Sequence, residues 1–79
     1  MPKRKFRRGQ VVAKCIHFKG ERKTYICGYG AVKCHSPREG TDGYVLEGAG
    51  WWYTATMSEG TRMYLRCLTK REWMEYRGA

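Results

Sequence analysis

The chain of 79 residues contains no long apolar run. A membrane-spanning helix needs about 20 consecutive apolar residues, and no segment here approaches that length. The basic N-terminus is followed by glycine and polar residues, where a secretory signal peptide would have an apolar segment. We therefore expect a cytoplasmic protein with no membrane partner.

Motifs of the common catalytic sites are also missing from the sequence. There is no G-x-x-x-x-G-K loop to hold the phosphates of a nucleotide, and no pair of carboxylates stands out for acid and base catalysis. An enzyme would have to build its site at an oligomer interface. We therefore expect no catalytic residues, no cofactor and no enzymatic activity.

The four cysteines include no C-x-x-C pair, the short spacing with which a turn aims two thiolates at one zinc ion. Cys34 and His35 are adjacent on a predicted strand, so their side chains would point to opposite faces. Disulfides are rare in a reducing cytoplasm, and a buried free thiol packs as a small apolar group. The sequence therefore predicts no metal site. It predicts buried free thiols at Cys15, Cys27, Cys34 and Cys67.

Acidic residues are scarce in the N-terminal third of the chain. In residues 1–23 only Glu21 opposes nine basic side chains, whereas residues 24–79 carry seven basic and six acidic ones. Such a basic block attracts polyanions, because each neutralised phosphate releases counterions. The alternative is a solvated surface that keeps the protein soluble. The predicted nucleic-acid-binding residues are Lys5, Arg7, Arg8, Lys19, Arg22 and Lys23.

Stretches rich in β-branched and aromatic residues, separated by glycine-rich turns, predict five short strands. They are residues 9–18, 24–35, 44–48, 51–57 and 62–68, where 51–57 is either a separate strand or a continuation of 44–48. An open sheet of such short strands would leave unpaired edges, which favours a closed one. We predict one all-β domain, a five-stranded small barrel over residues 9–79, preceded by a flexible basic arm at residues 1–8.

A short C-terminal helix is predicted at residues 69–76. Thr69 and Glu72 fit a capping box, in which each side chain accepts a hydrogen bond from the backbone N–H of the other. Trp73 and Tyr76 are three residues apart and share one helix face. We expect these two rings to pack the helix against the end of the barrel.

Two adjacent tryptophans, in the segment GAGWWYT, raise the question of which one is exposed. In a strand Trp51 and Tyr53 share one face and Trp52 takes the other. Gly48 and Gly50 permit a bend just before them, so the sequence leaves the outward tryptophan open. The outward ring would either cover a neighbouring strand or subunit, or bind single-stranded nucleic acid or an extended peptide. The predicted surface aromatics are Trp51, Trp52, Tyr53 and Tyr29.

Two segments resemble the SH3-like small β-barrel family. FRRGQVVA (6–13) resembles the aromatic, basic and glycine entry into the first strand of these barrels, and YLRCLTKRE (64–72) resembles the final strand of bacterial members. The resemblance covers most of the chain and implies a five-stranded SH3-like barrel. It also implies that Lys19, Arg22 and Lys23 lie in the first long loop, which flanks the ligand groove in this family.

A weaker resemblance is to the plasmid-borne type II dihydrofolate reductases, SH3-like barrels that work as tetramers around one pore. Residues 29–48, YGAVKCHSPREGTDGYVLEG, have the strand, polar turn and second strand of that family. The pore of the family is lined by a Val-Gln-Ile-Tyr segment. Its nearest counterpart here is TRMY (61–64), with Tyr64 in the tyrosine place and Arg62 in the glutamine place. Four symmetry-related arginines would repel one another in a pore, which argues against reductase activity.

The sequence therefore predicts a small basic binding module. Its partner would be nucleic acid or another polyanion, bound through the arm, the first loop and the surface aromatics. One alternative is an adaptor that binds a protein or peptide through an aromatic groove. The other is an oligomeric ligand-binding barrel related to the type II reductases, and whether the chain forms a homo-oligomer stays open.

Overall fold

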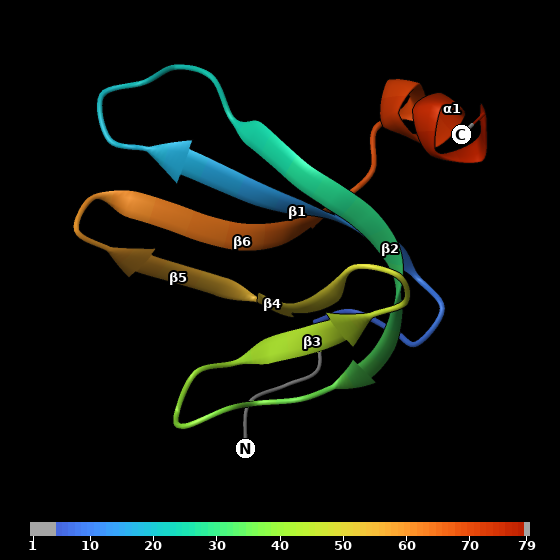
Figure 1. The fold of residues 1–79 in the computed structure, drawn as a ribbon, viewed down its shortest axis with the longest axis horizontal. Coiled ribbons are helices and arrows are strands. Elements are labelled where there is room, and N and C mark those ends of the chain that lie inside the picture. The colour runs from blue at the N-terminus through green and yellow to red at the C-terminus, as the bar shows by residue number, and fades with distance from the viewer. Residues whose placement is uncertain (1–4, 79) are drawn as a thin grey trace.

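The structure, a computed structural model, describes residues 5–78. This part of the chain forms six strands and a terminal helix (Figure 1). The strands are β1 (Val11–Phe18), β2 (Tyr25–His35), β3 (Gly43–Leu46), β4 (Gly50–Tyr53), β5 (Ala55–Ser58) and β6 (Thr61–Cys67). The helix is α1 (Lys70–Gly78). The predicted all-β fold with a short C-terminal helix is confirmed.

The predicted number of strands is wrong, because residues 51–57 form two strands instead of one. The break between β4 and β5 is at Thr54. The backbone N–H of Thr54 donates to the carbonyl of Asp42 at 3.0 Å, and the carbonyl of Thr54 accepts from the N–H of Leu65 at 3.2 Å. The chain thereby leaves β3, the partner of β4, and continues as β5 along β6.

The six strands form one antiparallel sheet in the order β4-β3-β2-β1-β6-β5. β2 is long and bent (Figure 1): it pairs with β1 as far as Ala31 and with β3 from Val32 onward. The register shifts once in each of these two pairings, and such bulges bend and twist a strand. The sheet is curled enough that β4 at one edge comes close to β6 near the other.

The core lies on the inner side of this curled sheet. Its buried residues are Phe6, Val12, Val32, Tyr44, Leu46 and Leu65. The hydroxyl of Tyr44 accepts the backbone N–H groups of Lys5 at 2.7 Å and Phe6 at 3.2 Å. Phe6 therefore belongs to the folded body, although residues 1–8 are predicted to be an arm. Residues 1–4 of that arm lie outside the described residues.

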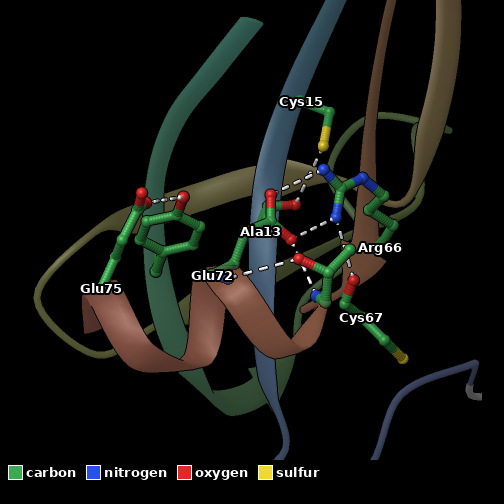
Figure 2. A network of polar contacts seen from close by, with 8 residues as sticks. Ala13, Cys15, Arg66, Cys67, Glu72 and Glu75 are labelled. Atoms are coloured by element: carbon green, nitrogen blue, oxygen red, sulfur yellow. Dashed lines mark hydrogen bonds and ion pairs between the residues drawn. The ribbon is translucent and has the colours of Figure 1, made fainter. Parts of the chain in front are cut away.

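Helix α1 is held on the sheet by a charged pair (Figure 2). Arg66 of β6 donates to both carboxylate oxygens of Glu72, at 2.6 and 2.7 Å. The predicted capping box is present, since Thr69 N donates to Glu72 Oε1 at 2.9 Å and Glu72 N donates to Thr69 Oγ1 at 3.3 Å. Glu72 is the buried residue of the helix, whereas Trp73 is 38% exposed. Of the two rings predicted to pack the helix against the sheet, Tyr76 contacts Tyr29 of β2, with ring centroids 6.4 Å apart, whereas Trp73 lies on the side of the helix away from Glu72.

Protonation of Glu72 is expected to weaken the fold at low pH. The hydrogen bonds from Arg66 lower the pKa of Glu72 from 4.5 to about 2. A lowered carboxyl pKa stabilises the fold above the unfolded-state value, and this stability is lost as the pH falls through the folded-state value. We expect Glu72→Gln to cost about 1–2 kcal/mol at neutral pH, because it weakens two hydrogen bonds between charged groups. Water and salt screen the partly exposed Arg66 and keep the cost in this range.

Urea unfolding of both proteins at several pH values measures this effect. The difference between wild type and Glu72→Gln should shrink as the pH falls from 4.5 towards 2. Glu75→Gln is the matched control, because the contact of Glu75 with the Tyr29 hydroxyl is long, at 3.5 Å. A Glu72→Gln protein as stable as Glu75→Gln at pH 7 would show that the pair does not hold the helix.

Candidate nucleic-acid interface

One end of the sheet gathers exposed rings and cations around the loop between β1 and β2. The turn between β5 and β6 lies beside this loop, and the N–H of Lys19 donates to the carbonyl of Gly60 at 2.8 Å. Gly60 has a positive φ of 82°, and a β-carbon there would lie only 3.0 Å from that of Lys19. Glycine thus allows the two turns to touch. We call this region the hairpin-tip surface and define it as His17, Phe18, Lys19, Arg22, Lys23, Tyr25 and Arg62.

The aromatic part of the hairpin-tip surface is the pair Phe18 and Tyr25. These residues end β1 and begin β2, so hairpin pairing brings them together. Their ring centroids are 5.7 Å apart, and they are 41% and 40% exposed. The hydroxyl of Tyr25 donates to Glu21 at 2.8 Å, and this hydrogen bond raises the pKa of Tyr25. Tyr25 therefore presents a neutral ring to solvent.

The basic side chains of this region come from two strands, β1 and β6, and from the loop between β1 and β2. His17 of β1 lies directly opposite Arg62 of β6. A hollow of about 570 Å³ is lined by His17, Lys19 and Arg62, with Gly20, Met57 and Gly60. No carboxylate from the described part of the chain lines it. The guanidinium of Arg62 lies 4.6 Å from the ring centroid of Tyr64, and the ammonium of Lys23 lies 5.7 Å from that of Tyr25. Because strand side chains alternate, His17 and Arg62 point to the face of the sheet opposite Phe18 and Tyr25. The hollow and the ring pair therefore lie on the two faces of the hairpin tip, and Lys23 is the cation beside the ring pair.

These cations are available to an external anion. Within residues 5–78, the ion pairs join only His35 to Asp42 and Arg66 to Glu72. The side chains of Lys19, Arg22, Lys23 and Arg62 are exposed and take no part in them. Glu21 is nearby, but its carboxylate accepts the hydroxyl of Tyr25.

The two predicted groups of cations do not lie together. Lys5, Arg7 and Arg8 precede β1 and are exposed, whereas Lys19, Arg22 and Lys23 follow it. β1 has eight residues, which corresponds to about 26 Å of extended strand. The described part of the arm and the first loop are therefore at opposite ends of β1 (Figure 1).

The adjacent tryptophans take opposite faces of β4, as the strand geometry predicts. Trp52 packs against the core, and the ammonium of Lys14 lies 5.0 Å from its ring while donating to the carbonyl of Ala49 at 2.8 Å. Trp51 is the outward one. Its indole N–H donates to the carbonyl of Ser36 at 2.7 Å.

Neighbouring residues cover much of the Trp51 ring. The ring lies against Gly43, where an added β-carbon would be 2.1 Å from the indole, and the guanidinium of Arg38 lies 5.0 Å from its centroid. Tyr53 packs at its edge, with centroids 4.8 Å apart. Tyr29 lies elsewhere, beside helix α1 and Tyr76. The four predicted surface aromatics therefore do not form one row.

The site residues that the sequence prediction missed are His17, Phe18, Tyr25 and Arg62. Arg62 comes next to Lys19 only through the pairing of β1 with β6, and this register is not visible in the sequence. The sequence does contain a signal for Phe18, because Phe18 and Tyr25 flank the polar loop of a predicted hairpin.

The cysteine prediction is only partly correct. Cys15 is buried, and burial raises the pKa of its thiol. Cys27, Cys34 and Cys67 are exposed free thiols, so the predicted burial is wrong for these three. Among residues 5–78 no group of three or more His, Cys, Asp or Glu side chains is arranged to hold a metal ion.

Comparison of the chain with protein-family models, curated proteins and solved structures finds no match. The resemblance to SH3-like barrels therefore stays a prediction. The helix in the described part of the chain is too short and too polar to cross a bilayer.

Proposed function

We propose that this protein is a small module that binds single-stranded nucleic acid at the hairpin-tip surface. The observation that carries the proposal is the gathering of an exposed ring pair, Phe18 and Tyr25, with cations that have no carboxylate partner within the described residues. Proteins that bind single strands without sequence readout combine these two features, since cations follow the phosphates and rings stack on the bases.

Each component has a separate physical role in this proposal. Lys23 lies beside Tyr25, and Lys19 and Arg62 lie on the other face of the tip. As the nucleic-acid strand passes around the end of the hairpin, these cations neutralise its phosphates and release their counterions. The rings of Phe18 and Tyr25 offer stacking faces to bases, which every base can use. A duplex hides its base faces, so the ring pair favours a single strand over double-stranded DNA.

We further propose that the curled sheet is an SH3-like small barrel. The bend of β2 between two pairings and the approach of β4 to β6 support this shape. The hairpin-tip loop is then the first long loop, which the resemblance assigns to the edge of the ligand groove.

The alternative of a peptide adaptor that uses Trp51–Tyr53 is less well supported. The face of Trp51 is covered by Arg38, and its indole N–H is already bonded to Ser36. A peptide would have to displace these contacts before it could use the ring.

Removing either exposed ring is expected to weaken binding of a single strand. Phe18→Ala or Tyr25→Ala should cost ~1–3 kcal/mol per stacked base, which is roughly 5- to 150-fold in Kd. Tyr25→Phe keeps the ring and should bind nearly as well as wild type. Fluorescence anisotropy with labelled oligo-dT and oligo-U measures these affinities.

Tyr53→Ala is the matched control on the other aromatic surface and should leave the affinity unchanged. The proposal is wrong if wild-type protein fails to bind either oligonucleotide at low salt. It is also wrong if Tyr53→Ala weakens binding while Phe18→Ala and Tyr25→Ala do not.

A further inference from the structure

Helix α1 has an unusual distribution of acidic and apolar side chains. Glu72 and Glu75 face the sheet, where they contact Arg66 and Tyr29 (Figure 2). The opposite face is formed by residues at helical spacing of three and four positions, and these line a hollow of about 500 Å³. They are Lys70, Trp73, Met74 and Arg77, and we call them the outer face of α1.

An ordinary surface helix turns its apolar stripe to the core and its charges to water. In α1, Tyr76 contacts Tyr29 of the sheet, but Trp73 and Met74 lie on the outer face beside Lys70 and Arg77. Trp73 is 38% exposed and Met74 is 75% exposed. Tryptophan is enriched among the residues that contribute most to protein interfaces, and methionine adapts its shape to different partners. The outer face of α1 therefore has the composition of an interaction surface that no other element within residues 5–78 covers.

The charges around the outer face decide which partner fits. Lys70 and Arg77 flank Trp73 and Met74, and among the described residues no acidic side chain lines the hollow. A second copy of α1 in the antiparallel orientation would place Lys70 against Arg77, and like charges in contact are unfavourable. An acidic partner would instead neutralise both cations while an apolar side chain fills the hollow.

We propose that the outer face of α1 binds a second protein through an acidic peptide that carries an apolar side chain. Carboxylates of the peptide pair with Lys70 and Arg77, and the apolar side chain packs against Trp73 and Met74. This surface is formed by different residues from the hairpin-tip surface, so the proposal does not rest on nucleic-acid binding. The protein would then join an acidic protein partner to a bound nucleic acid.

The probe is a synthetic amphipathic peptide with Leu and Phe on one face and Glu on the other. It is titrated into the isotope-labelled full chain, and amide and indole N–H chemical shifts are followed. The peptide should shift the signals of residues 70–77 and the indole N–H of Trp73. Met74→Glu and Lys70→Glu should each weaken its binding about tenfold or more.

Met57→Glu is the matched control, because Met57 is similarly exposed, at 69%, but lies in β5. It should leave peptide affinity unchanged, and Met74→Glu should leave oligo-dT affinity unchanged. A peptide with Lys in place of Glu should not bind.

Several results would overturn this proposal. They are failure of the acidic peptide to bind, equal binding of the lysine peptide, and loss of oligo-dT affinity in Met74→Glu, which would assign the face to nucleic acid. Self-association that Met74→Glu abolishes would assign the face to a second copy. Binding of anionic lipid vesicles through Trp73, in preference to the peptide, would assign it to a membrane surface.

Discussion

Replacing Lys19, Arg22, Lys23 and Arg62 together by alanine is expected to weaken binding to single-stranded oligo-dT by roughly 10²- to 10³-fold at ~0.1 M salt. The reason is electrostatic: each phosphate contact on a single strand adds ~0.7 to the slope of log K against log salt concentration. If each of the four cations meets a phosphate, the slope should fall by about 3. Anisotropy titrations at several salt concentrations give both quantities.

The matched control removes the same charge from elsewhere on the protein. Arg7, Arg8, Lys33 and Arg71 are exposed and lie outside the hairpin-tip surface. Their joint replacement by alanine leaves the same net charge as the first variant, and we expect a much smaller loss of affinity. Equal losses in the two variants would mean that binding depends on net charge alone, and would contradict a site at the hairpin tip.

Gly43→Ala is expected to destabilise the fold by about 3 kcal/mol or more, at the upper end of what overpacking costs. The added β-carbon would lie 2.1 Å from the Trp51 ring and 2.6 Å from the carbonyl oxygen of Trp52. The ring cannot move aside freely, because its N–H donates to Ser36. The carbonyl belongs to β4, which pairs with β3 at this point. Denaturant unfolding measures the change in stability.

Gly28→Ala is the control for Gly43→Ala. Gly28 also lies within a strand, but its nearest neighbour to an added β-carbon is the end of the Lys14 side chain at 3.9 Å, an ordinary contact. Alanine there should change the stability by less than about 1 kcal/mol, or raise it, because alanine restricts the unfolded chain. Equal stability of the two variants would mean that the Trp51 ring does not pack against Gly43.

The features that the sequence predicted correctly depend on local patterns. Glycine-rich turns between β-branched runs indicated the all-β fold, and the spacing of Thr69 and Glu72 indicated the start of the helix. The alternation of a strand placed Trp51 and Trp52 on opposite faces. In the structure Trp51 is the outward one. Its indole N–H donates to the carbonyl of Ser36, and its ring lies against Gly43.

The features that the sequence did not predict depend on contacts between distant residues. The break at Thr54 arises from its hydrogen bonds to Asp42 and Leu65, which no local signal marks. Trp73 stays exposed because Arg66 of β6 binds Glu72 and turns that face of the helix to the sheet.

Only part of the candidate site can be predicted from the sequence, because the rest depends on contacts between residues that are distant in the chain. The loop cations Lys19, Arg22 and Lys23 stand out in the sequence as a basic cluster. Their neighbour Arg62 does not, because it reaches them only through the pairing of β1 with β6. Charge alone groups the arm cations with the loop cations in the sequence, whereas in the structure β1 separates the two groups.

The most direct test of the central claim is a chemical-shift titration of the isotope-labelled full chain with oligo-dT. Binding at the hairpin-tip surface predicts shifts for the amides of residues 17–25 and 60–62 that saturate together. The indole N–H signals of Trp51, Trp52 and Trp73 should not move, because no tryptophan belongs to that surface. Shifts confined to β4 or to α1, or no shifts at low salt, would contradict the proposed nucleic-acid interface.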